Sequence, residues 1–175
     1  IGYDQFHQSE SDIFFYHLGR EVGLSNWNRY MKIFGFGQPT GIDIARGGDG
    51  EASGLITDRD YYLRNHGKWL GGDMLNLSIG QGETSTTPIQ IARYASALAV
   101  GHLPTPYVLK GNRANARAAA LAISEKTQEE IRSAMVDVVQ SLYGTGRQTR
   151  VEGITIAGKT GTAQNSHGED HALFI

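Results

Sequence analysis

Residues 151–163 read Val-Glu-Gly-Ile-Thr-Ile-Ala-Gly-Lys-Thr-Gly-Thr-Ala, and this stretch decides the fold that we predict. Ile154 and Ile156 alternate with Thr155 and Ala157, which is the period of two expected of a half-buried strand. The Lys-Thr-Gly-Thr that follows supplies a cation, two hydroxyl donors and a glycine that allows close approach to the backbone. These groups suit a small anionic group lying antiparallel to the strand. An ordinary strand with one exposed lysine is the alternative, because short motifs also arise by chance.

The composition is that of a globular domain. The chain has 175 residues, enough for one domain with a substantial core and too few to expect two. A formal net charge of -2 gives no reason to expect a nucleic-acid partner, and the absence of cysteine excludes disulfides and a thiol nucleophile. No apolar run approaches the roughly 20 residues of a membrane-spanning helix. Both ends read as interior parts of a fold, with a strand at 171–175, so we expect a fragment of a longer protein.

Capping residues and glycines predict helices around the sheet. The expected helices cover residues 12–22, 25–34, 87–100 and 124–142, and each carries apolar residues at helical spacing. Thr87 followed by Pro88 is a typical helix start. Ser124 or Thr127 caps the last helix, and Thr127 with Glu130 fits a capping box. Gly144-Thr145-Gly146 then reads as a turn before the strand, and a position at the border of a ligand groove is the alternative.

The remaining segments predict turns. Residues 45–72 are polar and rich in glycine, which indicates a long surface excursion anchored by Tyr61, Tyr62 and Trp69. Gly80-Gln81-Gly82 reads as a structural turn that supports the sheet. Strands and helices do not alternate along the chain, so the predicted fold class is α+β, with an antiparallel sheet flanked by helices.

Two kinds of chemistry find little support in the residues. His167 and His171 are four apart with carboxylates between them, but the segment reads as a loop between strands, so solvated hairpin residues are preferred and no metal or cofactor is expected. A serine hydrolase needs a nucleophile with a base in reach. The chain has no Gly-x-Ser-x-Gly elbow, and no serine is followed by a lysine three positions later.

Four stretches together resemble a known family. Residues 159–163, Lys-Thr-Gly-Thr-Ala, resemble the K-T-G-T motif of penicillin-binding proteins and serine β-lactamases. Residues 34–43 resemble the F-G-F-G…T-G-I-D segment of transpeptidase domains. Residues 77–90 resemble their G-Q-G…T-P-x-Q element, which β-lactamases do not share. Residues 12–16, Asp-Ile-Phe-Phe-Tyr, resemble a helix start of the cell-elongation branch of class B penicillin-binding proteins. The order and spacing also match, so we identify the chain as a member of this branch.

The resemblance implies a peptidoglycan D,D-transpeptidase that acts through a serine acyl-enzyme and is inhibited by β-lactams. Residues 1–175 would be a partial transpeptidase domain, without the upstream Ser-x-x-Lys nucleophile segment and the final strand or strands. Lys159 would supply positive charge and assist proton transfer. Thr160 and Thr162 would bind the terminal carboxylate of the donor peptide, with Gly161 between them. The N–H of Thr162 would form half of the oxyanion hole.

The family's second motif is altered in this sequence. Alignment on the aromatic run makes Asp12 the acidic third member of a Ser-x-Asp motif, which implies a catalytic role, although simple helix capping is the alternative. The serine should fall at Glu10, so Ser9 or Ser11 is the candidate that would replace it. Phe14, Phe15 and Tyr16 are expected in the core.

The resemblance also implies partners and a location. Peptidoglycan stem peptides, β-lactam antibiotics and a membrane-embedded glycan polymerase are the expected partners. The expected location is the extracytoplasmic face of the cytoplasmic membrane in a bacterial cell envelope, through an anchor that is not in this chain. A non-catalytic transpeptidase-like scaffold or β-lactam sensor is the alternative function, because the nucleophile motif is missing from these residues. The G-Q-G and T-P-x-Q elements disfavour a β-lactamase.

Overall fold

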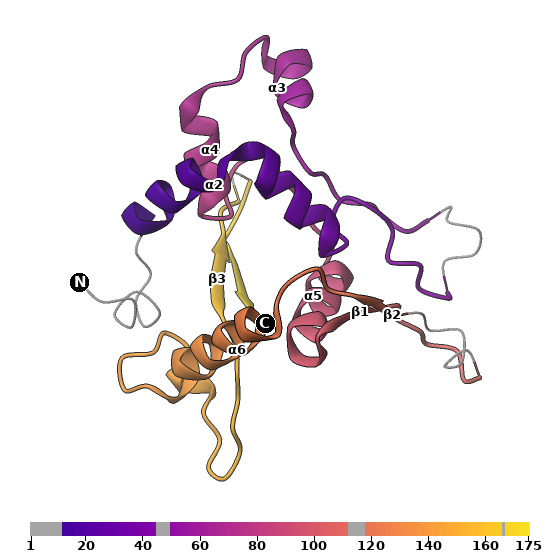
Figure 1. The fold of residues 1–175 in the computed structure, drawn as a ribbon, viewed down its shortest axis with the longest axis vertical. Helices are drawn as coiled ribbons and strands as arrows, with labels where there is room; N and C mark the ends of the chain where they lie inside the picture. The colour runs from indigo at the N-terminus through magenta and orange to yellow at the C-terminus, as the bar shows by residue number, and fades with distance from the viewer. Residues whose placement is uncertain (1–11, 45–49, 112–117, 166) are drawn as a thin grey trace.

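The computed structural model describes residues 12–44, 50–111, 118–165 and 167–175. Its elements, in chain order, are α2 (Asp12–Ile33), α3 (Arg59–His66), α4 (Gly71–Ser78), α5 (Pro88–Val100), β1 (His102–Pro104), β2 (Ala118–Ala120), α6 (Glu125–Gln140), the 3-10 helix η3 (Arg147–Thr149), β3 (Thr160–Ala163) and β4 (His171–Phe174). β1 pairs with β2 and β3 with β4, both antiparallel. Figure 1 shows the β3–β4 hairpin between α2 and α4 at one end and α6 at the other. Helices around small antiparallel sheets confirm the α+β prediction.

Helix α2 contains both of the first two predicted helices. Gly23, where the first was expected to end, has φ 70 and ψ 159 and interrupts the helical backbone. The expectation that the aromatic run of α2 lies in the core is wrong for Phe15, which is 37% exposed, whereas Phe14 and Tyr16 are half-buried. The buried residue of α2 is Gly19. A Cβ at Gly19 would lie 2.3 Å from Ser78 Cβ of α4, so the close contact between these helices depends on a glycine.

The surface excursion predicted for residues 45–72 contains a helix that the sequence patterns do not predict, α3, and the start of α4, and most residues of α3 are exposed. The side chain of Asp58 accepts a hydrogen bond from the Tyr61 N–H, 2.7 Å from nitrogen to oxygen, which caps the start of α3. Gly67 ends α3 in the left-handed conformation. Tyr62 is 5% exposed and its ring centroid lies 4.8 Å from that of Trp69, so two of the predicted anchors do pack together.

Two predicted helix starts are confirmed. The Thr87 hydroxyl caps α5 by accepting a hydrogen bond from the Gln90 N–H. In turn, the side-chain oxygen of Gln90 accepts a hydrogen bond from the Thr87 N–H, which completes a capping box. The amide nitrogen of Gln90 also donates to the carbonyls of Gln38 and Ser53, at 2.8 Å each. Gln90 is 1% exposed, so one buried amide joins the start of α5 to two loops. Ser124 is the residue that caps α6, which settles the choice between the two candidates.

The core lies beside the β1–β2 pair. Ala97 of α5, Leu103 of β1 and Leu121 form one buried cluster, with Phe34 and Ile123 packed against it. On α6, the buried residues are Val138 and Val139.

The Thr-Gly-Ile-Asp motif of residues 40–43 serves the fold. The carboxylate of Glu51 accepts bonds from the Thr40 N–H at 2.7 Å, from the Thr40 hydroxyl and from the Gly41 N–H at 3.0 Å. Asp43 accepts bonds from the N–H groups of residues 108 and 109, at 2.8 and 3.0 Å. The motif therefore connects the turn at residues 40–43 to Glu51 and to residues 108–109.

The strand predicted at residues 154–157 is wrong, and β3 begins later. Val151 and Ile154 form only an isolated bridge, closed by a hydrogen bond of 3.2 Å from the Ile154 N–H to the Val151 carbonyl. Gly153 has φ 76 between them, so the chain turns here and Ile154 is left 57% exposed. The alternating residues thus lie around a turn, and the strand coincides with the Thr-Gly-Thr-Ala that follows Lys159.

Candidate active site

The register of the β3–β4 hairpin determines where the main chain of β3 points. Lys159 and Ile175 exchange both backbone hydrogen bonds, at 2.9 and 3.1 Å, so they form a hydrogen-bonded pair. Thr160 lies opposite Phe174 and Thr162 opposite Ala172. Hydrogen-bonded and non-hydrogen-bonded pairs alternate in an antiparallel ladder, so the N–H and C=O groups of Thr160 and Thr162 point away from β4.

The two threonine side chains lie on the same face of β3, because side chains alternate along a strand. Thr160 is half-buried and Thr162 is exposed. Lys159 is exposed, and its ammonium group donates to the Thr160 carbonyl at 2.8 Å. One strand therefore presents a cation, two hydroxyls and outward main-chain groups along a single edge.

Helix α6 and the C-terminal strand hold the start of β3. The Gly158 N–H donates to the Met135 carbonyl of α6 at 2.9 Å. A Cβ at Gly158 would lie 2.3 Å from the Phe174 ring and 2.7 Å from the Ile175 carbonyl oxygen. The glycine before the lysine is therefore required by packing.

A loop after α6 brings a third hydroxyl to the strand. Gly144 lies so close to α6 that a Cβ there would be 2.2 Å from the Val138 carbonyl oxygen, and the Gly146 N–H donates to the same oxygen at 2.9 Å. Thr145, held between them, has its hydroxyl oxygen 2.8 Å from that of Thr160. The sequence predicts a turn here, with a position at the border of the ligand groove as the alternative, and a hydroxyl residue between two glycines is the signal of this contact.

The Gly80-Gln81-Gly82 turn reaches the same strand from another direction. The two glycines have φ 76 and 94, and the Gln81 N–H donates to the Asn76 carbonyl of α4 at 2.9 Å. The side-chain nitrogen of Gln81 donates to the Thr162 carbonyl at 3.0 Å. The prediction of a structural turn that supports the sheet is confirmed.

Comparison with known proteins agrees with this geometry. Residues 2–174 match the family model of the penicillin binding protein transpeptidase domain. The chain belongs to this transpeptidase domain family. Peptidoglycan D,D-transpeptidase MrdA of Acinetobacter baumannii is 36% identical over 165 residues, and stage V sporulation protein D of Bacillus subtilis is 37% identical over 161. These matches cover 87% and 86% of this chain but only 24% and 23% of the relatives, so the chain spans about a quarter of their length.

Solved structures of the family show the same fold. Penicillin-binding protein PBP2 of Helicobacter pylori, in complex with MreC, superposes with a TM-score of 0.87 at 30% identity, covering 99% of this chain and 33% of that one. PBP2 of Pseudomonas aeruginosa, in complex with WCK 5153, gives 0.82 at 29% identity, covering 99% and 40%. The MrdA and PBP2 matches are consistent with the class B, elongation-type branch that the motifs predict.

Of the other predicted site residues of this transpeptidase domain, the structure describes Asp12. Asp12 is the exposed first residue of α2, where a carboxylate suits the helix dipole. Within the described ranges no hydrogen bond or ion pair joins Asp12 to β3, so its catalytic role stays a prediction. Ser9 and Ser11 lie outside the described residues.

The histidine-containing loop of the transpeptidase domain closes the β3–β4 hairpin. The Asn165 N–H donates to the Asp170 carboxylate at 3.0 Å, and the His167 N–H donates to the Asn165 side chain at 3.0 Å. Across the part of the chain that the structure covers, no three metal-binding side chains gather. None of the helices described is long and apolar enough to cross a membrane.

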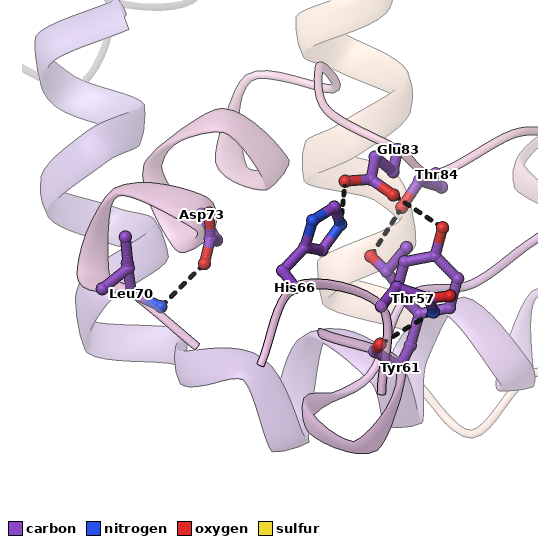
Figure 2. A network of polar contacts seen from close by, with 8 residues as sticks. Thr57, Tyr61, His66, Leu70, Asp73, Glu83 and Thr84 are labelled. Atoms are coloured by element: carbon purple, nitrogen blue, oxygen red, sulfur yellow. Dashed lines mark hydrogen bonds and ion pairs between the residues drawn. The ribbon is translucent and has the colours of Figure 1, made fainter. Parts of the chain in front are cut away.

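A polar network holds the far side of the Gln81 loop (Figure 2). Glu83 accepts a bond of 2.6 Å from the Tyr61 hydroxyl, and its other oxygen lies 2.6 Å from His66 Nε2. The hydroxyl oxygens of Thr57 and Thr84 lie 3.3 Å apart beside this pair. The hydrogen bond to Glu83 raises the pKa of Tyr61 above its usual value. Through Tyr61 and His66, helix α3 thus binds Glu83, which lies two residues after Gln81 in the loop.

Proposed function

We propose that this chain supplies the carboxylate-binding strand of a serine-type peptidoglycan D,D-transpeptidase. The observation that carries the proposal is the edge of β3, where Lys159, Thr160 and Thr162 line up beside main-chain groups that point away from β4. A peptide carboxylate is a small anion, and it would meet one ammonium group and two hydroxyl donors there. The names of the MrdA relatives support the choice of peptidoglycan as substrate.

The glycine between the two threonines supports the same function. Among the described residues, a Cβ at Gly161 would meet only Leu173 Cβ, at the ordinary distance of 3.9 Å. Packing therefore does not explain this glycine, in contrast to Gly158. A ligand that lies against the backbone would explain it, because glycine offers the closest approach.

In the proposed mechanism a serine attacks the carbonyl of the penultimate D-alanine and releases the terminal D-alanine. The acyl group then passes to an amine of a neighbouring stem peptide. No serine of residues 1–175 is followed by lysine three positions later, so we assign the nucleophile to a Ser-x-x-Lys segment elsewhere in the full-length protein. Lys159 attracts the carboxylate and assists the proton transfer. The N–H of Thr162 donates to the developing oxyanion, and one such donor is worth about 3 kcal/mol.

The proposal includes the setting of the reaction. β-Lactams would acylate the same serine, and the protein would act at the extracytoplasmic face of the membrane in a bacterial cell envelope. A membrane-embedded glycan polymerase would supply the strands to be cross-linked. The proposal includes a further protein partner, in view of the Helicobacter pylori PBP2 complex with MreC.

Acylation of the full-length protein by a fluorescent penicillin tests the proposal. The wild type should label and should also convert a donor peptide ending in D-Ala-D-Ala. Lys159→Ala should abolish labelling, because the cation of the carboxylate site is removed. Lys126→Ala is the matched control, since Lys126 is an exposed lysine of α6 that pairs only weakly with Glu130, at 3.9 Å.

Three outcomes would contradict the proposal. A wild type that does not label would favour the non-catalytic scaffold. Labelling without any reaction of the donor peptide would favour a β-lactam sensor. Rapid hydrolysis of the penicillin would favour a β-lactamase.

A further inference from the structure

We propose that Gln81 is a positioning residue of the transpeptidase site, which holds the main chain of Thr162 so that its N–H points at the oxyanion. The inference rests on the proposed function and deepens it. Gln81 is 81 residues from Thr162 in sequence, and its side-chain nitrogen donates to the Thr162 carbonyl at 3.0 Å.

The register explains why Thr162 needs such a support. Thr162 faces Ala172 as a non-hydrogen-bonded pair, so β4 makes no backbone bond to its N–H or C=O. The flanking residues Gly161 and Ala163 are the ones that bond to β4. On the side of Thr162 that faces away from β4, the side-chain amide of Gln81 donates the hydrogen bond to the carbonyl that a neighbouring strand would otherwise donate.

The loop that carries Gln81 is held at both ends. On one side, the Gln81 N–H bonds to the Asn76 carbonyl at the end of α4, next to Leu77, which is 2% exposed. On the other side, Glu83 is fixed by Tyr61 and by His66, each at 2.6 Å (Figure 2). Gly80 and Gly82 provide the positive φ values that the tight turn between these anchors requires. The backbone of Gln81 is therefore held in place while its side-chain amide bonds to Thr162.

The contact affects the chemical step more than substrate binding. An oxyanion donor works only when it lies about 2.7–3.1 Å from the position of the charge in the transition state. The carboxylate instead meets Lys159 and the threonine hydroxyls, none of which bonds to Gln81 in the described structure. Loss of the Gln81 bond should therefore slow acylation while leaving non-covalent affinity nearly unchanged.

Three substitutions at Gln81 in the full-length protein test this inference. Gln81→Glu keeps the shape but places an acceptor against the Thr162 carbonyl, and Gln81→Met keeps the length without a donor. Gln81→Lys keeps a donor of similar reach. The measurement is the time course of acylation by a fluorescent penicillin, resolved into the dissociation constant of the initial complex and the rate constant of acylation. Thermal melts of each variant report on folding.

The first two variants should lower the acylation rate constant about tenfold or more, because small misplacements of catalytic groups have effects of this size. Their dissociation constants should stay within about twofold of the wild type, and Gln81→Lys should recover most of the rate. A wild-type rate in Gln81→Met would overturn the inference. So would equal defects in Gln81→Met and Gln81→Lys, since the loop would then act only structurally. A wild type that does not label would overturn the proposed function and this inference with it.

Discussion

Removal of the Thr145 hydroxyl is a direct test of how the carboxylate site is built. The Thr145 and Thr160 hydroxyl oxygens lie 2.8 Å apart, so one of them donates to the other. When Thr145 donates, the proton of Thr160 can be directed at the substrate carboxylate. When the hydroxyl of Thr145 is lost, nothing from this loop orients Thr160 in that way.

The size of the effect follows from one neutral hydrogen bond. Such a bond contributes about 1 kcal/mol, which corresponds to about a fivefold change in a rate or binding constant. Thr145→Val has nearly the same volume as the wild type and removes only the hydroxyl. Because Thr145 is exposed, water can replace part of the lost hydrogen bond. Fivefold is therefore the upper end of the expected decrease in the rate or binding constant.

The assay is the second-order rate constant for acylation of the full-length protein by a β-lactam. Thr145→Val should lower it about three- to fivefold, and Thr145→Ser should stay near the wild type because it keeps the hydroxyl. Thr155→Val is the matched control, since Thr155 is exposed and lies outside the strand. A wild-type constant for Thr145→Val, or an equal loss in Thr145→Ser, would refute the assigned role.

Two further substitutions test the framework that carries the site. Burial alone would raise the pKa of Glu51, but hydrogen bonds from the hydroxyl and N–H of Thr40 and from the next two N–H groups lower it below its usual value. The carboxylate therefore contributes stability that is present above the unfolded-state pKa and is lost as the pH falls through the folded-state pKa. Glu51→Gln should lower the free energy of unfolding by about 1 kcal/mol at neutral pH and by progressively less in acid, as measured by urea denaturation between pH 7 and 3. A difference between wild type and variant that stays constant over this pH range would contradict the role of the carboxylate. Gln90→Leu should cost about 3 kcal/mol in the same experiment, because it leaves the Thr87 N–H and the carbonyls of Gln38 and Ser53 without their partner; a loss below about 1 kcal/mol would contradict this account.

Local signals were sufficient for most helix boundaries. Thr87 with Pro88 starts α5, Ser124 starts α6 and Gly23 interrupts α2, because the groups involved in capping and in helix breaking lie within a few residues of one another. The same short range explains the error at residues 151–157. Apolar alternation alone does not separate a strand from a turn, and the positive φ of Gly153 decided for the turn.

The sequence by itself determined the family and its Lys-Thr-Gly-Thr motif, because both depend on the order of residues along the chain. Only the tertiary structure showed that Thr145 and Gln81 contact β3 from two other loops. The sequence separation is 15 positions for the contact of Thr145 with β3 and 81 positions for that of Gln81. It also showed that Gly19 is required for the close approach of α2 to α4, where a Cβ would lie 2.3 Å from Ser78 Cβ. A side chain's partners across such distances depend on how helices pack, and no local pattern of residue types encodes that arrangement.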